Sequence, residues 1–88
     1  MRIMGQKIIG QNKNSNSSAK SIYYATDDQQ YVVDSTPELG ILKSLGIVKD
    51  AIIRKQKTYK LGGPVLLKVE SSEIAIGKDI AENIMVRR

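Results

Sequence analysis

The chain has 88 residues, a length that fits one domain, and carries 14 lysines and arginines against 9 acidic residues, a formal charge of +5. It contains no cysteine and no histidine, which excludes a disulfide framework and the usual zinc ligands, so we expect neither a cofactor nor a metal site. No apolar run approaches the ~20 residues of a membrane span, and the start is too short for a signal peptide. We therefore expect a soluble, cytoplasmic protein without membrane insertion.

The basic excess is concentrated in residues 49–60. This segment holds five cations and one acid, Asp50, a local charge of 5 − 1 = +4; the cations are Lys49, Arg54, Lys55, Lys57 and Lys60. Such a charge favours an acidic partner, whether nucleic acid, an anionic membrane surface or an acidic protein face. The segment is either a nucleic-acid stripe or a solvated strand edge whose lysines discourage further pairing. The second interpretation is favoured.

The first part of the chain predicts little packed structure. Residues 6–10 could form a short strand, whereas residues 11–18 are almost wholly Asn, Ser, Gln and Lys and predict a mobile loop. We expect residues 1–20 to be partly flexible within a single domain that spans residues 1–88.

Two strands are predicted next, at residues 21–25 and 31–33, on either side of a turn at Asp27–Asp28. These strands hold three of the four tyrosines, Tyr23, Tyr24 and Tyr31. They could form a stacking platform for bases, but half-buried strand residues with hydroxyls in water are favoured. The two aspartates share one polar turn, so their environments do not separate their pKa values as a catalytic pair requires.

A helix is predicted to begin at Ser35 or Thr36 and to run to about Leu45. Ser35 and Glu38 have the spacing of a capping box, and Gly46 suits the left-handed position that ends a helix. Its leucines, which recur every third residue, predict an apolar face that plugs one open end of the sheet. Gly40 inside this helix suggests a close contact, because glycine weakens a helix by ~1 kcal/mol relative to alanine.

The second half predicts a meander of three antiparallel strands, at residues 51–59, 65–70 and 73–76. The turns fall at residues 61–64 and at Ser71–Ser72, and Gly62–Gly63 would supply positive φ at the first. Alternation places Ile53 and Lys55 on one face of the first strand. Leu66 faces outward, either covered by another element or exposed for a partner. A helical turn at residues 77–83, with Ile80 as its packing residue, precedes a last strand at 84–86.

From residue 40 to residue 86 the ordered signals resemble the FeoA family. The matching residues are Leu42, Leu45–Ile47, Leu61–Val65, Ile74–Ile76, Ala81 and Ile84–Val86. The resemblance implies a mainly β fold, a small SH3-like antiparallel β-barrel with one or two short helices. The family usually has Pro-Gly after the Leu-Gly-Ile motif. Here Lys49–Asp50 stand there, so Asp50 must adopt the left-handed conformation.

The resemblance also implies a function without catalysis. Family members are cytosolic accessory proteins of bacterial ferrous iron transport that act on the GTPase-transporter FeoB through protein–protein interaction. We therefore expect a protein partner, the cytosolic region of FeoB, and no enzyme activity. The candidate contact residues are Tyr59, Leu61, Gly62, Gly63 and Leu66. The alternative is a nucleic-acid-binding small β-barrel that uses the basic strand at 49–60.

Overall fold

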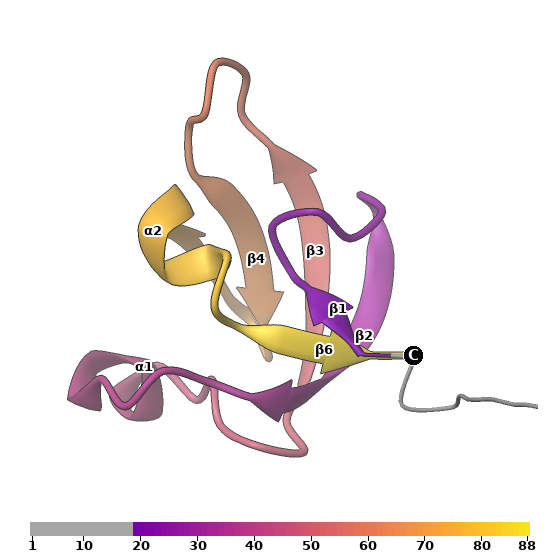
Figure 1. Ribbon diagram of the computed structural model, residues 1–88. Coiled ribbons are helices and arrows are strands. Elements are labelled where there is room, and N and C mark those ends of the chain that lie inside the picture. Colours follow the sequence, from indigo (N-terminus) through magenta and orange to yellow (C-terminus); the bar gives the residue numbers. More distant parts are fainter. Residues whose placement is uncertain (1–18) are drawn as a thin grey trace, which may run out of the picture.

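The computed structural model describes residues 19–88, and in them six strands form one antiparallel sheet accompanied by two short helices (Figure 1). The strands are β1 (Lys20–Ser21), β2 (Gln29–Ser35), β3 (Ile52–Thr58), β4 (Val65–Val69), β5 (Ser72–Ile76) and β6 (Met85–Arg87). The helices are α1 (Gly40–Ser44) and α2 (Lys78–Ala81). The strand order is β1-β6-β2-β3-β4-β5, which confirms the mainly β fold. The strand and loop predicted within residues 1–18 lie outside the described part.

The predicted meander is confirmed, since β3 pairs with β4 and β4 pairs with β5. The position of its second turn was wrong by one residue. Val69 pairs with Ser72, so the turn consists of Glu70 and Ser71. Glu70 adopts a left-handed φ of 58°, as a tight two-residue hairpin requires.

The strand predicted at residues 21–25 was wrong beyond Ser21. The carbonyl of Ser21 accepts the N–H of Tyr24 at 3.2 Å, and its hydroxyl accepts the N–H of Tyr23 at 3.1 Å. These two bonds turn the backbone away from the sheet. The strand predicted at residues 31–33 is present and extends over the whole of β2.

Helix α1 begins later than its capping pattern predicted. Ser35 pairs with Met85 at the end of β2, so it is unavailable as a cap, and the N-cap residue Leu39 makes no side-chain capping bond. Gly46 ends the helix at φ 84° as expected. The predicted contact at Gly40 was wrong, because a Cβ added there would meet nothing within 4 Å.

The core lies on one face of the strongly bent sheet. Alternate residues along the strands face it, and Ile53, Val65, Leu67, Val69 and Ile76 are buried there. Helix α1 adds only Leu42 as a fully buried residue. In α2 the fully buried residue is Ala81, while the expected Ile80 is only partly buried against the core.

Three findings bear on further expectations from the sequence. Strand β3 lies between β2 and β4, so its basic residues do not form a sheet edge, and that interpretation of residues 49–60 was wrong. Asp50 has the expected left-handed φ, 71°. In residues 19–88, neither helix has the length and apolar character needed to cross a membrane.

Candidate functional site

The connection between β3 and β4, residues 59–64, protrudes from the sheet as the β3–β4 loop, opposite the end where α1 lies (Figure 1). The N–H of Tyr59 donates to the carbonyl of Pro64 at 2.9 Å and closes the loop. Only one of the two glycines has the predicted positive φ: Gly62, at 73°, follows Leu61 at 60°. Gly63 instead allows a close approach, since a Cβ there would lie 3.0 Å from the Cβ of Tyr59.

The loop brings four of the five candidate contact residues to one end of the molecule. Leu61 is fully exposed and Tyr59 is 41% exposed. The Nζ of Lys57 lies 4.7 Å from the centroid of the Tyr59 ring, a cation–π contact. Leu66 stands apart from the loop, half-buried on the outer face of β4 and opposite Lys57. The result is an apolar and basic tip with Leu66 further down the sheet.

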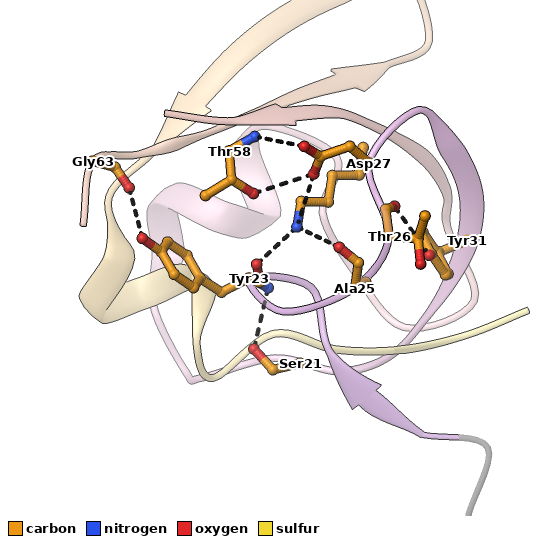
Figure 2. Close-up of polar contacts among 9 residues, drawn as sticks. Ser21, Tyr23, Ala25, Thr26, Asp27, Tyr31, Thr58 and Gly63 are labelled. Atoms are coloured by element: carbon orange, nitrogen blue, oxygen red, sulfur yellow. Dashed lines mark hydrogen bonds and ion pairs between the residues drawn. The ribbon is translucent and has the colours of Figure 1, made fainter. Parts of the chain in front are cut away.

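The base of the loop is fixed by a residue that the sequence did not identify. The hydroxyl of Tyr23 donates to the carbonyl of Gly63 at 3.1 Å, as Figure 2 shows. The Nζ of Lys78, at the start of α2, lies 5.5 Å from the centroid of the Tyr23 ring. Tyr23 therefore connects the loop to the segment that follows β1, while the tip remains free.

Lys55 is the one buried charged side chain in the part of the chain that the structure describes. It holds the segment that follows β1 in place. Its Nζ donates to the carbonyls of Tyr23 at 2.7 Å and of Ala25 at 2.6 Å, and lies 3.2 Å from Oδ1 of Asp27 (Figure 2). Three oxygen partners compensate the desolvation of the ammonium. Alternation in the sequence placed Lys55 on the same face of the strand as Ile53. That shared face was the available signal for burial, but the burial of Lys55 was not predicted.

The basic segment at residues 49–60 is accordingly less available than its composition suggested. Lys55 is buried, and Arg54 makes an ion pair of 2.8 Å with Asp28. Asp27 accepts a hydrogen bond from the hydroxyl of Thr58 at 3.2 Å. The two aspartates of the predicted turn thus bind cations and a hydroxyl of β3.

The three N-terminal tyrosines have different environments. Tyr23 and Tyr31 are buried, and the hydroxyl of Tyr31 donates to the carbonyl of Thr26 at 3.1 Å. The prediction of half-buried rings with hydroxyls in water was therefore wrong for both. Tyr24 is exposed and donates to Glu82 at 2.5 Å, which raises the pKa of its hydroxyl. One exposed ring does not make a stacking platform.

The described residues offer no grouping of three or more His, Cys, Asp or Glu side chains that could hold a metal ion. A further apolar patch surrounds α1, where Leu39, Ile41 and Val48 are exposed. It borders a shallow hollow of about 390 Å³, lined in part by Lys43 and Lys49.

The fold and this surface can be compared with known proteins. The family model of the FeoA domain matches residues 27–88. The chain belongs to the FeoA family. A FeoA protein described as an iron uptake regulatory protein is 24% identical, with a TM-score of 0.71 over 78% of this chain and 94% of that one. No curated protein sequence matches the chain significantly.

Two other solved structures have a fold similar to that of this FeoA-family chain. FeoA of Stenotrophomonas maltophilia, solved with zinc and described as a prokaryotic SH3 domain protein, is 25% identical. Its TM-score is 0.64, over 74% of this chain and 86% of that one. A manganese-dependent transcriptional repressor is 20% identical, with a TM-score of 0.71 over 78% of this chain but only 41% of the repressor. The predicted SH3-like fold is confirmed, with β1 and β5 at the two ends of the strand order.

Proposed function

We propose that this FeoA-family chain is a cytoplasmic accessory protein of ferrous iron uptake that regulates FeoB through protein contacts and catalyses no reaction. The observation that carries the proposal is the family match over residues 27–88. The FeoA protein of Stenotrophomonas maltophilia is described as a candidate activating factor of bacterial ferrous iron transport. Transfer of that role to this chain is part of the proposal.

The contact surface that we propose comprises the β3–β4 loop and the outer face of β4. It contains Tyr59, Leu61, Gly62, Gly63 and Leu66. A fully exposed Leu61 contributes nothing to the core, and its left-handed backbone is unfavourable for a bulky side chain. Backbone strain retained at an exposed position supports a role in recognition. The bond from Tyr23 to Gly63 limits the entropy that the loop loses on binding.

A nucleic-acid partner has less support. Of the five cations in residues 49–60, Lys55 is buried and Arg54 is paired with Asp28. The phosphate contacts that dominate such affinity need free cations, and this segment retains fewer of them than its sequence suggested.

The test is a binding measurement by titration calorimetry with the purified cytosolic region of FeoB, loaded with GDP or with a non-hydrolysable GTP analogue. We expect Leu66→Asp to weaken binding about tenfold, equivalent to ~1.4 kcal/mol. Ile41→Asp, which changes an exposed apolar residue on α1 at the other end of the molecule, is the matched control and should bind as the parent does. Undetectable binding of the parent protein in both nucleotide states would refute the proposal.

A further inference from the structure

The β3–β4 hairpin carries charge of one sign only. Residues 51–69 contain no acidic residue, and their cations are Arg54, Lys55, Lys57, Lys60 and Lys68. Lys57 and Lys60 lie at the loop end and are exposed. Lys78, at the start of α2, also lies beside the loop, with its Cδ 3.9 Å from the position of a Cβ added to Gly62. The tip itself therefore carries two lysines and no acid, and Lys78 adds a further cation next to it.

The apolar side chains of the tip lie among these lysines. Leu61 is fully exposed at φ 60°, a conformation that asparagine or glycine would adopt more readily. Tyr59 exposes an aromatic ring with a polar hydroxyl, which suits the boundary between headgroups and water. Exposed leucine, tyrosine and lysine together are typical of segments that bind at a membrane interface. In this chain they occur at the end of a protruding loop.

We propose that the tip of the β3–β4 loop docks on the surface of an anionic lipid bilayer. Leu61 enters the boundary between headgroups and acyl chains, Tyr59 lies at headgroup level, and Lys57 and Lys60 contact lipid phosphates. A bilayer accepts a convex protrusion without a preformed groove, and its negative charge complements a tip that has no acid of its own. The contact is interfacial and needs no spanning segment.

The expected affinity is low. Each lysine close to an anionic membrane strengthens binding about fivefold, so Lys57 and Lys60 together contribute about 25-fold. Insertion of Leu61 contributes about tenfold, because only part of its apolar surface leaves water. Such a contact raises the local concentration of the protein near a partner embedded in the same membrane. Because it is reversible, Tyr59 and Leu61 can leave the bilayer and then contact FeoB, so the two contacts alternate. In that respect it adds to the proposed function, yet it can be tested without FeoB.

The experiment is co-sedimentation of the full chain with vesicles of equal parts phosphatidylglycerol and phosphatidylcholine, compared with vesicles of phosphatidylcholine alone. We expect binding to the anionic vesicles only, weakening as salt screens the lysines. Leu61→Asn should lower the apparent affinity about tenfold. Because asparagine tolerates the left-handed backbone, the melting temperature of this variant should be no lower than that of the parent. The double variant Lys57→Gln with Lys60→Gln should bind about 25-fold more weakly.

Ile41→Asn on α1 is the matched control and should bind vesicles as the parent does. Absence of binding to anionic vesicles, or equal binding to both kinds, would overturn the inference. An equal loss in Leu61→Asn and Ile41→Asn would also overturn it, because the loop would then have no special role. If the chain does not bind the anionic vesicles but Leu61→Asn weakens FeoB binding, the tip contacts protein and only the lipid inference is refuted. Vesicle binding without FeoB binding would refute only the proposed function.

Discussion

The hydroxyl of Tyr23 lies 3.1 Å from the carbonyl oxygen of Gly63, 40 residues further along the chain. Tyr23 as a whole is 8% exposed, so this hydrogen bond joins the base of the β3–β4 loop to the interior. The loop therefore has a fixed base and a free tip, an arrangement that presents Leu61 to a partner in a defined position.

Tyr23→Phe should loosen the base of the loop without disturbing the packing of the ring. The substitution removes the donor to Gly63 and should lower the free energy of unfolding by about 1 kcal/mol. The backbone amides of residues 60–63 should exchange with solvent faster, which nuclear magnetic resonance can follow. Unchanged exchange rates of these amides would show that the hydrogen bonds within the loop, such as that from Tyr59 to Pro64, hold it without Tyr23. The amides of β3 serve as the internal control.

Lys55→Met should be strongly destabilising although methionine fills much of the same volume. The carbonyls of Tyr23 and Ala25 would lose their shared donor in the interior, and Asp27 would lose its ion-pair partner. We expect the free energy of unfolding in urea to fall by about 3 kcal/mol. Lys60→Met, at the exposed loop, should change it by no more than about 0.5 kcal/mol. Equal effects of the two variants would contradict this account of Lys55.

Gly46→Ala and Gly40→Ala should have opposite effects on stability. Gly46 has φ 84°, and a Cβ there would lie 3.3 Å from Cγ1 of Val69, so alanine should cost about 1 kcal/mol or more. Gly40 begins α1 in open space, so alanine there should stabilise by up to about 1 kcal/mol through its higher helix propensity. Thermal denaturation of both variants beside the parent provides the measurement. A stabilised Gly46→Ala variant would show that the helix end can rearrange.

Stability should also depend on the ionisation of Tyr24 at high pH. The hydrogen bond to Glu82 raises the pKa of the Tyr24 hydroxyl above its ordinary value of 10.0. Because the neutral hydroxyl is the donor, the stabilisation is complete below about pH 10 and is lost as pH rises through the pKa of the folded state. In Glu82→Ala this pKa should return toward its ordinary value. An absorbance titration of tyrosinate in both proteins, with Tyr24→Phe to assign the signal, checks this.

The parts of the fold that could be predicted are those set by neighbouring residues. The alternation in Val65–Val69 determines which side chains face the core, and the Gly46 backbone ends α1 as its position predicted. The start of α1 could not be predicted in the same way. Ser35 has both the chemistry of a cap and the ability to extend a strand, and its pairing with Met85 decides between them. That partner is remote in sequence.

The candidate site also combines features that neighbouring residues set with features that depend on remote partners. Leu61 and the two glycines were predicted as a turn from turn chemistry, whereas Tyr59 was predicted as the end of the preceding strand; the structure places all four in the β3–β4 loop. The burial of Lys55 depends on carbonyl groups of residues 23 and 25, which no pattern within β3 contains. Chemistry within a turn is visible in the sequence, whereas the polar contacts that support the turn from another segment are not.

The insertion of β6 between β1 and β2 has a consequence for the order of folding. The turns of the β3–β4–β5 meander close short stretches of chain, whereas the ion pair of Arg87 with Asp34 joins residues 53 positions apart. Closing the longer stretch costs more chain entropy, so we expect the meander to nucleate folding and β6 to be added late. Pulsed hydrogen exchange during refolding should show protection in β4 before protection in β6. The sheet would then be complete only when β6 has docked between β1 and β2, so the stability of the whole domain would depend on the last pairing to form.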